Sequence, residues 1–249
     1  MGKIGVTYLV GLKLILCAGL FAQNSEPDSI NASSLKPASV EISKQKHYEA
    51  KDFSYLFGMP GFSDNALNLH FTLYKGYVKN ANLLLDTLAE YNTKGDTKSP
   101  EYSELKRRLG WEFDGMRLHE LYFENLGKQL PLDPGSSLHA DLVQNFGSYD
   151  LWKNDFVSTG AMRGIGWVVL YRDPVSGRLV NMWINEHDVG HLTGGSPLLV
   201  MDVFEHAYLP DYQLDRAKYI DAFFQNINWE IIEKRSAKTL LDMPAPAAS

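Results

Sequence analysis

The sequence predicts an α+β fold, in which an N-terminal antiparallel helical hairpin precedes a small three-stranded antiparallel sheet flanked by helices. Two observations predict it. The first half holds two long segments with apolar residues at helical spacing, and the second half holds short β-rich runs separated by turn residues. The chain has 249 residues, 45% of them hydrophobic, which is enough to bury the core of one large domain or two small ones.

The helical hairpin is predicted over residues 64–126. Its first helix spans 64–91, with Ser63 or Asp64 as the N-cap. The core-facing side chains of this helix recur at helical spacing, at Leu67, His70, Tyr74, Tyr77, Ala81, Leu84, Leu85 and Leu88. A polar turn leads to a second helix over 101–126, and helices joined by so short a loop are expected to pack antiparallel.

A proline-containing connection separates the helical first half from a second half that holds both short helices and β-rich runs. Turn residues over 173–177 lie between two β-rich runs, which predicts a hairpin. The expected elements are helices over 137–146 and 148–159, strands over 164–171, 179–185 and 198–202, and helices from about 211 to the neighbourhood of 235. These elements form a helical hairpin domain at 53–130 and an α/β C-terminal domain at 131–240, followed by a flexible tail at 241–249.

The first 22 residues have the layout of a secretory signal peptide. Lys3 and Lys13 precede an apolar run that ends at Ala22, and residues 23–52 then form a polar linker or irregular arm. An uncleaved membrane anchor is the alternative, although the apolar run is short for a span. Lipidation at Cys17 ranks lower, because Leu16 is larger than a lipoprotein processing site accepts. We therefore expect export to the periplasm or beyond the cell, with no stable membrane association after cleavage.

Cleavage after Ala22 would change both charge and redox chemistry. It removes the only cysteine, so the mature protein would have no disulfide. It also removes two lysines and no acids, which leaves 22 basic and 30 acidic residues and a formal charge of −8. A surface this acidic argues against a nucleic acid as partner.

A run of polar and aromatic residues from Met201 to Trp229 carries the strongest functional signal. Asp202 and His206 lie four residues apart, and a carboxylate with an imidazole suits a first-row transition metal, although such a pair alone is more often an ordinary polar contact. The full pattern is Asp202, Glu205, His206, Ala207, Tyr208, Asp211, Tyr212, Arg216, Tyr219 and Trp229. It resembles the C-terminal signature of iron/manganese superoxide dismutases.

The resemblance extends to two segments of the helical hairpin. His70 precedes a Tyr77-Val78 pair as in the family's first ligand segment, and His119 precedes aromatic residues and an Asn-Leu pair as in the second. It implies that one iron or manganese ion per chain is held by His70, His119, Asp202 and His206. The implied reaction converts superoxide into oxygen and hydrogen peroxide by alternate reduction and oxidation of that ion.

Six further residues take roles that the resemblance implies. Tyr77, His187 and Arg216 are the catalytic ones: an active-site tyrosine, a proton donor from the loop after the second strand, and a cation at the gateway. Trp167 lines the pocket. Glu205 reaches the partner chain's ligand histidine and Tyr208 lies in the same interface, so a homodimer or homotetramer is expected.

This chain departs from the family pattern at two places. His70 and Tyr77 are seven residues apart instead of eight, which puts in doubt the substrate funnel near Tyr74. Gly115 stands where some members carry a helical glutamine, and His187 is the replacement that we favour. Iron and manganese both stay open. The alternative function is an exported metal-binding or assembly protein that keeps the dismutase fold with little turnover.

Overall fold

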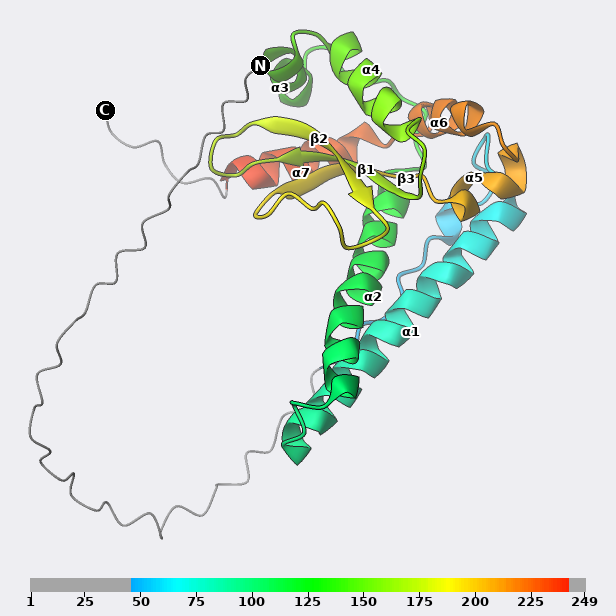
Figure 1. The fold of residues 1–249 in the computed structure, drawn as a ribbon. Helices are drawn as coiled ribbons and strands as arrows, with labels where there is room; N and C mark the ends of the chain where they lie inside the picture. Colours follow the sequence, from blue (N-terminus) through cyan, green and yellow to red (C-terminus); the bar gives the residue numbers. More distant parts are fainter. Residues whose placement is uncertain (1–45, 242–249) are drawn as a thin grey trace, which may run out of the picture. The chain divides into compact units, whose positions relative to one another are not determined.

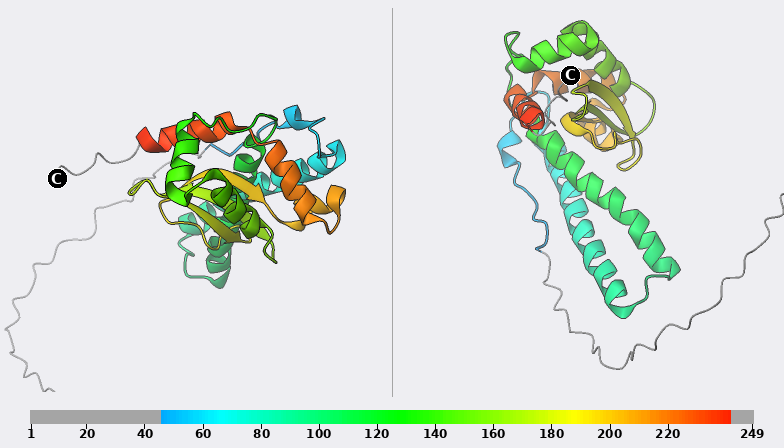
Figure 2. Two further views of the ribbon diagram at one scale, coloured as in Figure 1. Left: turned by 90° about the horizontal axis from the view of Figure 1, so that it is seen from above. Right: turned by 90° about the vertical axis from the view of Figure 1, so that its left-hand side faces the viewer.

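The computed structural model describes residues 46–241, so the expected signal peptide, most of the arm and residues 242–249 lie outside it. Long helices α1 (Asp64–Lys94) and α2 (Pro100–Glu124) follow a short 3-10 turn at Ser54–Leu56. They lie side by side as the predicted antiparallel hairpin (Figure 1; Figure 2). The Ser63 hydroxyl caps α1 by accepting from the Ala66 N–H, and Gly95 ends the helix in the left-handed region at φ 72°.

The sheet has the three predicted strands, β1 (Gly166–Arg172), β2 (Leu179–Asn185) and β3 (Ser196–Asp202), in the antiparallel order β2-β1-β3. The central strand β1 is buried along its whole length. Its register places Trp167 opposite Asp202 of β3. At Gly166, with φ 140°, a Cβ would lie 1.9 Å from the Ile184 carbonyl oxygen, so the strand can begin there only with glycine.

Five helices surround this sheet. They are α3 (Ser137–Phe146), α4 (Tyr149–Gly160), α5 (Glu205–Tyr212), α6 (Arg216–Gln225) and α7 (Trp229–Leu241). Helix α4 packs on β1 and β2, while α2 and α7 pack against β3 (Figure 1). The α+β class is therefore confirmed.

The last three helices differ from the prediction in where they begin and end. Helix α5 begins at Glu205, six residues before the predicted start near 211, because the motif around His206 has no apolar period of its own and Pro210 is typical of a helix end. A turn at Gln213, with φ 52°, separates α5 from α6, and α7 continues to Leu241, beyond the predicted end near 235.

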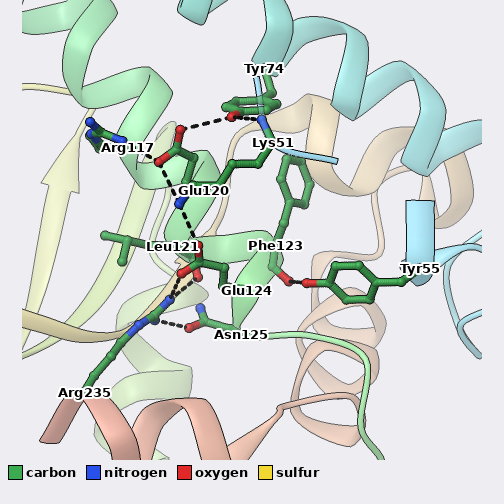
Figure 3. Close-up of polar contacts among 10 residues, drawn as sticks. All are labelled: Lys51, Tyr55, Tyr74, Arg117, Glu120, Leu121, Phe123, Glu124, Asn125 and Arg235. Carbon is green, nitrogen blue, oxygen red and sulfur yellow. Dashed lines mark hydrogen bonds and ion pairs between the residues drawn. The ribbon is translucent and has the colours of Figure 1, made fainter. Parts of the chain in front are cut away.

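Residues 46–52 lie along the hairpin without regular secondary structure, and their packing begins before Phe53, where the prediction placed the start of order. The Tyr48 backbone exchanges hydrogen bonds with the Asn82 side chain of α1, at 2.9 and 2.8 Å. In Figure 3, the Lys51 ammonium lies between Glu120 and Glu124 of α2, and Arg235 of α7 reaches Glu124. This charged cluster joins the arm, the hairpin and the last helix.

Of the helices within residues 46–241, none is both long enough and apolar enough to span a bilayer.

Candidate metal centre

Four side chains from distant parts of the chain converge inside the fold. His70 lies on α1, His119 on α2, Asp202 at the end of β3 and His206 in the first turn of α5. One donor atom from each lies within 4.8 Å of every other. The Asp202 Oδ2 atom is 3.1 Å from Nε2 of both His70 and His206 and 3.7 Å from Nε2 of His119. The structure thus brings together the four residues that the sequence proposed as ligands.

The orientation of His119 shows that the cluster suits a cation. Its Nδ1 lies 2.6 Å from the Gly115 carbonyl oxygen, which can only accept, so Nδ1 carries the proton. The neutral ring then directs a lone pair from Nε2 into the cluster, where Nε2 is buried without a hydrogen-bond partner. A lone pair that faces a carboxylate oxygen 3.7 Å away leaves a favourable place for a positive ion. Imidazole and carboxylate ligands together fit iron or manganese.

Burial and hydrogen bonding set the charges of these groups. Burial lowers the pKa values of His70 and His119, so both rings are neutral and free to bind a metal at neutral pH. Burial opposes ionisation of Asp202, but attraction to His206 and hydrogen bonds from His206 and His70 outweigh it and lower its pKa. The cluster therefore offers the neutral imidazoles of His70 and His119 and the negative charge of Asp202.

Two contacts that sequence reasoning missed orient Asp202. The backbone N–H of Phe204 donates to Oδ1 at 2.8 Å, so Oδ2 is the oxygen that faces the histidines. The Tyr219 hydroxyl donates to the Asp202 main-chain oxygen at 2.6 Å. The first contact is an Asx-type turn, for which an aspartate just after a buried strand is the available sequence signal. The second joins α6 to β3. Tyr219 belongs to the sequence pattern, but the pattern did not indicate its contact with Asp202.

His187 lies beside this cluster and is fully buried. The Trp167 indole N–H donates to Nδ1 at 3.0 Å, so in the neutral ring the proton is on Nε2, which lies 2.8 Å from the Tyr77 hydroxyl. Burial lowers the pKa of His187 to about 4, so the ring is neutral at pH 7. His187 therefore donates to the Tyr77 oxygen, and the Tyr77 proton is left for a group in the centre. Burial raises the pKa of Tyr77, which keeps that proton in place.

The glycine at position 115 makes room for Tyr77. A Cβ there would lie 2.8 Å from Cδ1 and 2.9 Å from Cε1 of the tyrosine ring. A larger side chain at this position would thus meet the ring where it now stands. The hydroxyl of the same tyrosine meets His187, from the loop after β2, at 2.8 Å.

Arg216, Tyr208 and Glu205, for which gateway and interface roles were expected, lie on the two helices that follow β3. The Arg216 guanidinium donates to the carbonyl oxygens of Met162 and Gly164, at 2.6 and 2.8 Å, and to the Tyr208 hydroxyl at 3.2 Å. These acceptors are uncharged, so they leave its positive charge unneutralised. Glu205 is exposed and the His206 side chain is 27% exposed, whereas the other three ligand candidates are buried.

Tyr74 does not line an opening. It is fully buried, and its hydroxyl accepts from the Lys51 N–H and donates to Glu120, each at 3.0 Å (Figure 3). Arg117 donates to the second oxygen of Glu120 at 2.6 Å, so this buried carboxylate is paired. The tyrosine therefore belongs to the cluster that holds the arm.

Comparison with known proteins agrees with this arrangement. Residues 134–235 match the family model described as "Iron/manganese superoxide dismutases, C-terminal domain". The chain is 38% identical to Superoxide dismutase [Fe] of Aquifex pyrophilus over 197 residues, which cover 77% of this chain and 92% of that protein. It is 36% identical to Superoxide dismutase [Fe] of Saccharolobus solfataricus over 209 residues (78% and 96%). It is 33% identical to Superoxide dismutase [Mn] 2 of Haloferax volcanii over 172 residues (69% and 85%).

Proposed function

This chain belongs to the iron/manganese superoxide dismutase family, and we propose that it converts superoxide into oxygen and hydrogen peroxide with one iron or manganese ion. His70, His119, Asp202 and His206 would hold that ion. The observation that carries the proposal is their convergence around the unpaired Nε2 of His119. When bound, the ion would supply the redox chemistry, taking an electron from one superoxide and giving it to a second.

The protein's own groups supply protons and orientation. His187 donates through Nε2 to Tyr77, and Trp167 holds the opposite ring nitrogen, so this pair keeps one orientation. The Tyr77 hydroxyl can then donate to the substrate side, and each peroxide formed takes up two protons. Orientation of groups that surround a metal ligand set is a main way in which a protein tunes such a centre.

Arg216 is proposed to draw the anionic substrate toward the site. The chain as a whole has a formal charge of −6, which repels an anion at long range. A local cation whose hydrogen bonds all go to uncharged oxygens offsets this repulsion near the centre.

A homodimer, alone or as half of a homotetramer, is proposed from the edge of the site. Glu205 is exposed beside His206, the least buried of the four ligand candidates. A second chain could cover this edge and bring its own glutamate to His206. Sedimentation of the wild-type chain and of Glu205→Ala tests this, because the variant should shift toward the monomer.

Export is proposed from residues 1–22 alone. Their basic start, apolar middle and small residue at Ala22 are typical of a cleaved signal. N-terminal sequencing of the protein from its native host would check this, and a mature chain that begins at Met1 would contradict it.

Metal analysis and turnover together test the proposed function. The purified chain would be loaded separately with iron and with manganese, each metal measured per chain, and superoxide removal measured for each form. We expect about one ion per chain and catalytic removal by at least one form. Metal binding without turnover would favour the alternative, a metal-binding or assembly protein with the dismutase fold.

A further inference from the structure

The short loop that carries His187 is held from two sides. Asn185 and Val189 exchange backbone hydrogen bonds at 2.8 and 3.3 Å, which closes a tight turn around Glu186 and His187. On one side, the Trp111 indole N–H of α2 donates to the Glu186 carboxylate at 3.0 Å. The other side is held by His191, the next histidine along the chain.

His191 binds the backbone of His187 itself. Its Nε2 lies 2.8 Å from the His187 carbonyl oxygen, which can only accept, so Nε2 carries the proton. In the neutral ring Nδ1 then accepts, and the Tyr171 hydroxyl lies 2.7 Å from it. Burial raises the pKa of Tyr171 to about 12, so the phenol keeps the proton that it donates. The Asp114 carboxylate is 3.7 Å from Nε2, which is too long to replace the carbonyl.

The result is a chain of contacts from the sheet to the centre. Tyr171 of the central strand β1 donates to His191, and His191 donates to the main chain of His187. Trp167, four residues before Tyr171 on the same strand, holds the His187 ring. The backbone and the ring of His187 are therefore both fixed to β1, and the ring is directed at Tyr77.

We propose that His191 is a positioning residue, which with Tyr171 fixes the backbone of His187 and so aims its Nε2 at the Tyr77 hydroxyl. This rests on the proposed role of His187 in catalysis. His191 touches neither the ligand set nor the substrate side. Its effect is exerted only through the loop.

Three variants of the metal-loaded full chain test the proposal. His191→Ala removes the donor to the His187 carbonyl, His191→Gln retains an N–H at the end of a side chain of similar length, and Tyr171→Phe removes the group that fixes the His191 tautomer. His139→Ala is the matched control, because His139 is a half-buried histidine stacked on Tyr149 in another part of the chain.

For His191→Ala we expect unchanged metal per chain and a loss of turnover per bound ion of about tenfold, the lower end of the range for groups that orient a metal site. In the wild type, His187 Nε2 lies 2.8 Å from the Tyr77 hydroxyl oxygen. In the crystal structure of His191→Ala, this distance should be too long for a hydrogen bond. His191→Gln should restore most of the turnover, Tyr171→Phe should lose less than His191→Ala, and the control should lose none.

The proposal is overturned if His191→Ala keeps both the wild-type distance between His187 and Tyr77 and the wild-type turnover per ion. It is also overturned if turnover falls only in proportion to lost metal, or if glutamine restores nothing. The distance between His187 and Tyr77 tests the positioning role of His191 independently of any activity measurement. A wild-type chain without dismutase activity would end the proposed function, yet the crystal structures would still report whether His191 positions His187.

Discussion

The helical hairpin and the sheet domain each contribute two ligand candidates, and they hold them in different ways. His70 and His119 are buried within long helices, and His119 is fixed by a carbonyl of its own helix, one turn away. Asp202 and His206 lie where β3 gives way to α5, and the nearby His187 is held by a loop with contacts to β1. The hairpin therefore supplies buried imidazoles from two helices, whereas the sheet domain supplies the negative charge of Asp202, the proposed proton donor His187 and the exposed edge.

The difference between the two regions is largest at Asp202. Replacing it with alanine removes the only negative charge among the four side chains and leaves three imidazoles facing one another. We expect Asp202→Ala to lose nearly all of its metal, by a factor above the 10- to 100-fold typical of mutating outer partners. Elemental analysis of the purified variant measures this, with the exposed Asp86→Ala as control. Full metal content in Asp202→Ala would mean that the hairpin alone holds the ion.

A substitution at His187 should distinguish the residues needed for metal binding from those needed for turnover. Because His187 hydrogen-bonds Tyr77 and Trp167 and none of the four ligand candidates, His187→Ala should keep the metal. Turnover per ion should fall about 10- to 100-fold, and His187→Gln, which can still donate, should lose less. Stopped-flow decay of superoxide, normalised to metal content, gives the comparison. An alanine variant with wild-type turnover would remove His187 from the mechanism.

Gly115 tests how rigid the hairpin side is. A Cβ at this position would come within 2.8 Å of the Tyr77 ring, so Gly115→Ala should destabilise the chain by about 1–3 kcal/mol, as overpacking does. Gly110→Ala on the same helix is a matched control, because a Cβ there meets nothing within 4 Å. It should instead stabilise the helix by up to about 1 kcal/mol. Urea unfolding of both variants measures the contrast, and equal effects would contradict it.

The burial of His187 predicts a pH dependence of stability in the metal-free chain. In the unfolded chain this imidazole takes up a proton near pH 6.5, whereas in the folded chain it does so only near pH 4. The unfolded state therefore binds more protons between these values, so the free energy of unfolding falls as the pH falls through this window. The slope from this group is at most about 1.4 kcal/mol per pH unit.

Comparison with His187→Gln isolates this contribution, because the glutamine does not titrate. Urea unfolding at several pH values should give a shallower slope for the variant than for the wild type. Identical slopes would show that His187 is not held neutral by the fold.

The sequence predicted the candidate metal ligands more completely than it predicted the contacts that orient them. Helical spacing places His70 and Tyr77 on one face, and the motif around Asp202 and His206 is local, so both could be read from single segments. The two hydrogen bonds of His191 join it to Tyr171 and to the His187 backbone, and neither contact follows from a local pattern. The Trp111 to Glu186 contact joins residues 75 positions apart and follows no periodic pattern, so only the folded structure reveals it.

The helices after β3 illustrate the same limit. The start of α5 at Glu205 was missed because its first turn consists of site residues with no apolar stripe. Trp229, at the end of the motif, is buried against Tyr149 and Trp152, so its role in the structure is packing. Apolar periodicity therefore predicts helix boundaries least well in segments whose residues are selected for function and not for core packing.

Anomalous diffraction from crystals of the metal-loaded chain, recorded at the iron and manganese absorption edges, tests the central claim most directly. The account predicts a single peak per chain, enclosed by Nε2 of His70, His119 and His206 and by Oδ2 of Asp202. A peak elsewhere, or no peak from a chain that removes superoxide, would contradict it.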